Sequence, residues 1–240
     1  LFPYTTLFRS NKRNEVVVDF LYDEIDCWCT RDCTAYPTQK DDKWGIIDRY
    51  GNVLEDFIYD DAQLISDNED NAGEFIILLK GDFKAIYSTK KRGFITEFEY
   101  NFVGYLSNNR FLVLKNGKVG FVDTNGEVVI PLIYDKYTHD DFSEGLCVVY
   151  KDGKAGVIDT EGNVVVPFEY YKLFDCHEGM IWARNSNNEY GYLNRKGEIV
   201  IPFGKYHVNF CFSDGLTSAW SENTGNVYLT KQGEVIELKF

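Results

Sequence analysis

Three aspartates in equivalent positions are the first residues whose type and spacing could do chemistry. Asp48, Asp123 and Asp159 each lie three residues before a glycine, and such a row of carboxylates could form a catalytic or calcium-binding ladder. In other copies of the same pattern the position holds Ser88, Asn194 and Thr230. These residues cap turns through their side chains but cannot replace a catalytic carboxylate. The pattern therefore favours turn capping over catalysis.

Histidines and cysteines offer weaker possibilities for a metal site. The three histidines, His139, His177 and His207, all fall in connecting segments but at different offsets from the preceding turn glycine, which argues against a shared site. Three of the six cysteines crowd one connector, Cys27, Cys29 and Cys33, without the fourth paired ligand that a zinc site needs. Cys147, Cys176 and Cys211 stand alone. We expect no metal or other cofactor, and free, partly buried thiols.

Composition and motifs exclude several classes of function. The sequence contains no phosphate-binding loop, no nucleophile elbow and no H-E-x-x-H, so we predict no catalytic residues and no enzyme. The net charge of −13, without a basic stripe, argues against a nucleic-acid partner. No apolar run in this fragment is long enough to span a membrane as a helix. The cysteine pattern weakly favours the cytoplasm.

A recurring phrase provides the scaffold for these residues. It is clearest as KVGFVDTNGEVVIP, from Lys118 to Pro131, and returns at steps of 35 to 40 residues. Its first glycine is Gly45, Gly120, Gly156 or Gly191, and in the two worn copies Ala85 or Val227. A constant period in this range is typical of repeat proteins, in which each unit buries its apolar face against its neighbours.

Each repeat is predicted to be a three-stranded antiparallel meander of about 36 residues. Asp152-Gly153 is a two-residue hairpin signal, and the prolines at 131, 167 and 202 predict a strand end or an edge strand. A tyrosine follows each phrase at Tyr59, Tyr134 and Tyr170, and we expect these anchor tyrosines to pack between units with hydrogen-bonded hydroxyls. The connector after Tyr134 offers a possible fourth strand.

The combined phrase resembles the bacterial WG repeat. Its elements are KWGIID at Lys43 to Asp48, IPLIYD at Ile130 to Asp135 and FSEGL at Phe142 to Leu146, although the Trp-Gly pair occurs only once. The resemblance implies tandem β-repeats without catalytic residues. It leaves open whether the all-β array is an open curved solenoid or an incomplete, β-propeller-like ring; we lean to the open form.

The repeat frame also divides the chain. Residues 1–10 resemble a translated sequencing adapter, and the array is predicted to be a metagenomic fragment whose true N-terminus is missing. A truncated first repeat is expected at 11–42, followed by units near 43–82, 83–117, 118–153, 154–188 and 189–224 and by a partial unit at 225–240.

Two functional hypotheses remain. The first is a non-catalytic scaffold that presents Tyr, Phe and Asp of its connectors to a protein partner. The alternative is a carbohydrate- or cell-wall-binding module, in which Tyr-Asp pairs form an aromatic platform for a glycan.

Overall fold

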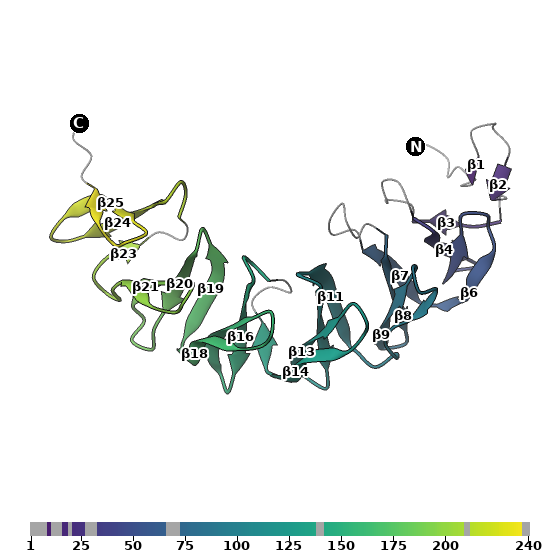
Figure 1. Cartoon of the computed structure of the whole chain (residues 1–240), viewed down its shortest axis with the longest axis horizontal. Coiled ribbons are helices and arrows are strands. Elements are labelled where there is room, and N and C mark those ends of the chain that lie inside the picture. The colour runs from purple at the N-terminus through teal and green to yellow at the C-terminus, as the bar shows by residue number, and fades with distance from the viewer. Residues whose placement is uncertain are drawn as a thin grey trace. The chain divides into compact units, whose positions relative to one another are not determined.

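The computed structural model describes residues 9–10, 16–18, 21–26, 33–65, 73–137, 142–208 and 212–236. Every regular element among them is a β-strand (Figure 1). Contacts between Cα atoms divide the chain into two compact units, Leu1–Asn116 with Val122–Glu127, and Gly117–Phe121 with Val128–Phe240. The prediction of an all-β array of antiparallel repeats is confirmed.

The N-terminal part begins with a two-stranded ribbon and continues with two four-stranded sheets. The ribbon pairs β1 (Arg9–Ser10) with β2 (Val16–Val18). The first sheet contains β3 (Glu24–Ile25), β4 (Ala35–Lys40), β5 (Lys43–Asp48) and β6 (Val53–Tyr59). The second contains β7 (Asp61–Ile65), β8 (Phe75–Lys80), β9 (Phe83–Ser88) and β10 (Gly93–Phe94).

Four further sheets follow in chain order. The third contains β11 (Phe102–Ser107), β12 (Arg110–Lys115), β13 (Lys118–Asp123) and β14 (Val128–Tyr134). The fourth contains β15 (Lys136–Tyr137), β16 (Leu146–Lys151), β17 (Lys154–Asp159) and β18 (Val164–Tyr170). The fifth contains β19 (Lys172–His177), β20 (Met180–Arg184), β21 (Tyr190–Asn194) and β22 (Ile199–Ile201). The last contains β23 (His207–Val208), β24 (Leu216–Ser221), β25 (Gly225–Thr230) and β26 (Val235–Ile236).

Each repeat has four strands, so the prediction of three is corrected. The connector after each anchor tyrosine supplies the additional strand, which becomes the first strand of the next sheet; β15 begins two residues after Tyr134. Each sheet among the described residues uses only strands that are consecutive in the chain. A propeller ring can be closed by a sheet that combines strands from the two ends of the chain. None of the described sheets does so.

Turn chemistry fixes the hairpins. Asp152 and Gly153, between β16 and β17, have φ values of 51° and 73°, which confirms the predicted two-residue turn. In the fourth, fifth and last sheets an acid-glycine pair forms a second hairpin turn, between the first and second strands. In the fifth sheet Glu178 and Gly179 have φ values of 50° and 77°, and His177 pairs with Met180 across them.

A bulge in the fourth strand explains the position of the prolines. In β18, Val166 pairs with Val157 and Tyr170 with Ala155, so four residues of β18 span two residues of β17. Pro167 lies inside this bulge on the edge strand, where its missing N–H breaks no ladder bond. The predicted edge placement is thus confirmed here, while the predicted strand end is found only at Pro202, which directly follows β22.

The core lies between successive sheets. Alternate residues of each inner strand face opposite neighbours, as in β20, where Ile181 and Ala183 pack toward the fourth sheet and Met180 packs toward the last. The fourth and fifth sheets share one buried cluster, and the fifth and last sheets share the next. Stacking of sheet on sheet therefore gives each repeat its hydrophobic interior, as the period predicted.

Some sequence features fall outside this description. Residues 1–8 of the predicted adapter, and Cys27, Cys29, Cys211 and His139, lie outside the described residues. Cys147 and Cys176 are buried and are not disulfide-bonded, as expected. Cys33 is disulfide-bonded, so the expectation of a free thiol is wrong there.

Candidate interaction surface

The in-register aspartates lie in turns and their carboxylates face the backbone. Asp159 Oδ1 accepts hydrogen bonds from the N–H groups of Glu161 (3.0 Å) and Asn163 (2.8 Å), while Asp159 Oδ2 accepts from the Asn163 side-chain amide (2.9 Å). Asp48 makes the same contacts in its own turn. Asp123 accepts from the same two backbone positions, while its Oδ2 accepts from the side-chain amide of Asn125. Although burial opposes it, hydrogen bonds from Asn163 and its neighbours hold the pKa of Asp159 below its ordinary value. These carboxylates therefore act as caps.

A second set of aspartates connects successive sheets. Asp135, directly after the anchor Tyr134, accepts a hydrogen bond from Lys118 Nζ in its own repeat and one of 2.7 Å from the Asp152 N–H in the next hairpin. In the first unit Asp60 accepts from Lys43 Nζ (2.5 Å) and from the Gly81 N–H (2.7 Å). The repeated lysine and aspartate of the phrase are thus an ion pair that also caps the neighbouring turn.

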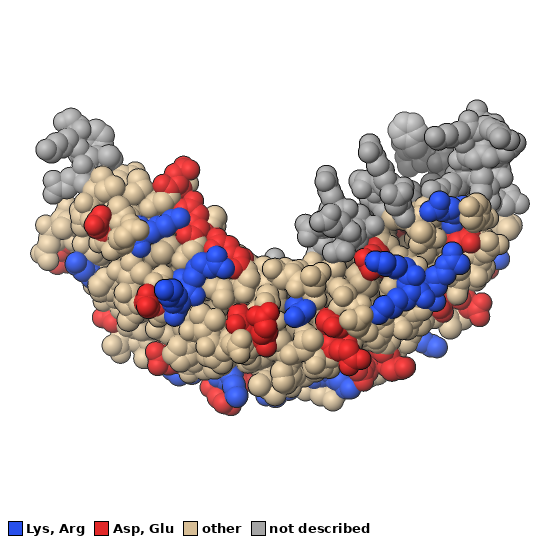
Figure 2. All heavy atoms as spheres, viewed as in Figure 1, with Lys and Arg blue, Asp and Glu red and all other residues tan. Residues whose placement is uncertain are grey.

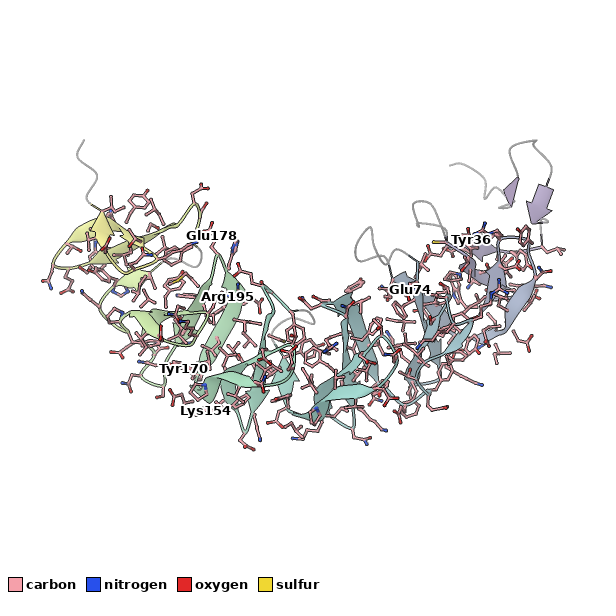
Figure 3. All side chains as sticks on the ribbon, viewed as in Figure 1. Tyr36, Glu74, Lys154, Tyr170, Glu178 and Arg195 are labelled. Carbon is pink, nitrogen blue, oxygen red and sulfur yellow. The ribbon has the colours of Figure 1, made fainter. Side chains whose placement is uncertain are left out.

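The acid-glycine turns make a third connection, at the opposite end of the sheets from Lys154 and Tyr170 (Figure 3). Glu178 Oε1 and Oε2 accept hydrogen bonds of 2.9 Å from the N–H groups of Asp214 and Gly215, in the equivalent turn of the next sheet. Lys231 Nζ lies 3.1 Å from Glu178 Oε2. Sequence reasoning missed this role, although the acid-glycine pairs recur in register.

Acidic pH is expected to weaken these connections between sheets. The hydrogen bond from Lys118, then that from Asp152, holds the pKa of Asp135 below its ordinary 3.8, and the Gly215 N–H followed by Lys231 lowers the pKa of Glu178 below 4.5. A carboxylate with a lowered folded-state pKa stabilises the fold at neutral pH, and this contribution disappears as the pH falls through the folded-state pKa. Urea unfolding at pH 7 and at about pH 3 should show that Asp135→Asn flattens the loss of stability.

Glu222 provides a matched control for this measurement. It is exposed and makes no ion pair among the described residues, so Glu222→Gln should retain the full loss on acidification. An Asp135→Asn chain that loses as much stability as the wild type between the two pH values would contradict the assignment.

The anchor tyrosines are buried at the joints between sheets. Tyr134 is 4 % exposed, and its ring stacks on Phe168 of the next sheet at a centroid distance of 5.8 Å. Tyr170 meets Phe203 in the same way at 5.9 Å. Tyr59 stacks on Phe98 at 5.5 Å, and burial raises its pKa. These rings therefore offer no open platform to a ligand.

The other candidate ligands are dispersed. His177 ends β19, and His207 begins β23 with its ring 5.3 Å from that of Trp220. The Cys176 thiol faces the Glu144 carboxylate at 3.3 Å, and burial followed by that carboxylate raises its pKa to about 12. Within the described ranges, no three His, Cys, Asp or Glu side chains are grouped to hold a metal ion.

Apolar side chains at equivalent positions of the edge strands are exposed and form a row. The row, called here the edge row, occupies the second position after the turn glycine. It consists of Val53 in the first unit and of Val128, Val164, Ile199 and Val235 in the second. Their exposed fractions run from 42 % to 57 %. Isolated exposed apolar residues are ordinary, but a row repeated on successive sheets of the second unit forms a larger feature.

Close contacts hold the edge row of the second unit together. A Cβ atom at Gly162 would lie 3.3 Å from Ile130 of the preceding sheet, one at Gly197 2.9 Å from the Val165 oxygen, and one at Gly233 2.7 Å from the Val200 oxygen. Each of these three turns therefore packs against the fourth strand of the preceding sheet. Val128, Val164, Ile199 and Val235 consequently follow one another at the spacing of stacked sheets, about 10 Å.

The surface of the protein carries charges of both signs. On the face in Figure 2, acidic and basic side chains lie in small separate groups with uncharged surface between them. Pro131 and Pro167 stand exposed in the edge strands, where they remove N–H donors that an added strand would need. The prolines therefore disfavour backbone pairing of an added strand with these edge strands.

No helix among the residues described has the length and apolar character to cross a membrane. No curated protein matches the sequence. Solved structures match at low identity: the designed protein Ika8 (12 % identity, 86 % of this chain and 71 % of that one, TM-score 0.39), a eukaryotic initiation factor (8 %, 85 % and 62 %, TM-score 0.46) and Hsv2 from Kluyveromyces lactis (11 %, 86 % and 74 %, TM-score 0.41).

The profile of the family described as WG containing repeat matches four consecutive stretches, residues 87–118, 120–154, 156–188 and 190–219. Together they cover more than half of the sequence, although the copy with the single Trp-Gly pair, at Trp44-Gly45, lies outside them. The four matched stretches contain the capping Asp123 and Asp159, the Lys118–Asp135 pair, and the anchor tyrosines Tyr134 and Tyr170. The chain therefore belongs to the family of WG-containing repeat proteins.

Proposed function

We propose that this chain is a non-catalytic scaffold that binds a protein partner along the edge row of its second unit. The observation that carries the proposal is the half-exposure of Val128, Val164, Ile199 and Val235 at equivalent places on successive sheets. The candidate catalytic carboxylates support it, because both oxygens of Asp159 are engaged in a turn.

The geometry suits an extended peptide segment. Four side chains spaced by stacked sheets reach over about 30 Å. Three acidic residues precede members of the row, Glu127, Glu198 and Glu234, and the whole chain carries a net charge of −13. Electrostatic complementarity therefore favours a partner segment in which apolar residues alternate with basic ones.

Selection from a phage-displayed peptide library tests this proposal. Peptides enriched on the wild-type chain should combine apolar and basic residues. Their affinity for a Val164→Ser/Ile199→Ser double variant should fall at least about tenfold, because the substitutions remove two neighbouring apolar contacts and tenfold corresponds to about 1.4 kcal/mol. Fluorescence anisotropy with the synthesised peptides provides the measurement.

Tyr171→Ser is the matched control, since Tyr171 is exposed but lies outside the edge row. Peptides that bind the double variant as tightly as the wild type would argue against the edge row as the binding surface.

The carbohydrate alternative has less support. Its platform required open Tyr-Asp pairs, but Tyr134 is buried against Phe168 and Asp135 is paired with Lys118. A glycan array on the wild-type chain is the direct comparison. Glycan binding together with a failure to enrich peptides would favour the alternative over the scaffold.

A further inference from the structure

The last sheet has one face that no described part of the chain covers. Ala219, Val227 and Leu229 turn toward the fifth sheet and are buried. The opposite face, called here the terminal face, consists of residues that pair across the strands: His207 with Trp220, Trp220 with Asn226, Ser218 with Tyr228, and Tyr228 with Ile236. Trp220, Tyr228 and Ile236 are 41 %, 38 % and 38 % exposed.

Comparison with the other repeats shows how unusual this exposure is within the molecule. The residue after the first glycine of the phrase, which is Tyr228 in the last sheet, corresponds to Ile46, Ile86, Phe121, Val157 and Tyr192. All five are at most 1 % exposed. Tyr192, for example, is in edge-to-face contact with Phe212, which lies between β23 and β24 of the last sheet. The terminal face thus has the position and apolar character of a surface that a β-sheet covers.

Charge distinguishes this face from the rest of the chain. None of its six residues is an acid, a lysine or an arginine, whereas the chain as a whole carries a net charge of −13. Two copies that met through acidic surface would repel each other. A contact through the terminal face places aromatic and apolar groups together without facing carboxylates.

We propose that the terminal face is a self-association surface, on which two copies of this chain meet last sheet to last sheet about a twofold axis. A head-to-tail contact would need an open face on the first sheet. There Tyr36, Thr38 and Ile47 are at most 5 % exposed, so that face is already covered. The same patch on both copies is the geometry of an isologous dimer.

The terminal face is small. β24 and β25 have six residues each, whereas β23 and β26 have two, so the four strands present roughly 250 Å² per copy at a spacing of about 4.8 Å. This is about a third of the area that one partner buries in a typical stable interface. We therefore expect a weak dimer that forms only at high protein concentration.

Sedimentation equilibrium over about 1 to 500 μM tests the proposal directly. The weight-average mass of the wild type should rise from 27.8 kDa toward twice that value, and more readily in high salt, because salt screens the repulsion between the acidic copies. Tyr228→Glu should remain at 27.8 kDa throughout, since it places two carboxylates in a symmetric apolar contact. Circular dichroism checks that this exposed substitution leaves the fold intact.

Two matched variants complete the test. Tyr171→Glu changes an exposed tyrosine of the fifth sheet and should dimerise like the wild type, and so should Val164→Glu in the edge row. A wild type that stays monomeric at every concentration would overturn the proposal. So would a dimer that survives Tyr228→Glu but is lost in Val164→Glu, or one that appears only when residues 237–240 are deleted.

Discussion

Gly120→Ala is expected to lower the free energy of unfolding by about 3 kcal/mol. A methyl group at this position would lie 2.6 Å from the Ile130 oxygen and 2.8 Å and 2.9 Å from the Leu132 nitrogen and Cα. All three atoms belong to the backbone of β14, so the bulged edge strand itself would have to move. Urea unfolding monitored by circular dichroism provides the measurement.

Gly153→Ala separates this steric effect from the general cost of replacing glycine. Gly153 has a φ of +73° but no atom within 4 Å of the position of an added Cβ. Only the backbone penalty applies there, about 1 to 2 kcal/mol. If Gly120→Ala cost no more than Gly153→Ala, close strand approach would not be the reason for glycine at this position.

Tyr134→Ala is expected to cost about 3 to 4 kcal/mol, because it removes a buried ring and leaves a cavity between two sheets. Its hydroxyl has no hydrogen-bond partner among the described residues, contrary to the sequence-based expectation. Tyr134→Phe should therefore cost less than about 1 kcal/mol. The same unfolding assay measures both variants.

This pair of variants also separates the roles of the anchor tyrosines. A tyrosine that served as a glycan platform would tolerate removal without loss of stability and would lose binding instead. If Tyr134→Ala unfolds at the same urea concentration as the wild type, the ring does not hold the sheets together.

The sequence predicts the inner strands well because their signals are local. The period, the turn glycines and the Asp-Gly hairpins are all properties of a few neighbouring residues. Even the exceptions have a local cause: Ala85 replaces the phrase glycine in the second sheet, where the fourth strand is only Gly93–Phe94. There the Ile86 N–H donates a hydrogen bond of 2.9 Å to the Thr96 hydroxyl. No long fourth strand therefore packs against Ala85.

The first strand of several sheets lacks such a signal. β15 and β23 contain two residues each, and the register of β19 shifts between Leu173 and Cys176. Neither a short strand nor a bulged one shows the alternation of apolar and polar residues by which strands are predicted. These connectors consequently look irregular in the sequence.

The exposed surfaces depend on neighbours that the sequence does not specify. Tyr192 and Tyr228 stand at the same place in their repeats, yet one is 1 % exposed and the other 38 %. What differs is whether another described sheet packs against that face. The edge row was missed for a related reason, since valine in a strand ordinarily predicts burial.

The repeat period affects how the length of such an array can change. Asp135 connects its own repeat to the following hairpin, and Asp60 makes the same connection in the first unit. Excision of residues 121–156 would join Gly120 directly to Val157 and restore the phrase. Gain or loss of DNA in multiples of one period, wherever the break falls, therefore yields a chain that keeps the repeat frame.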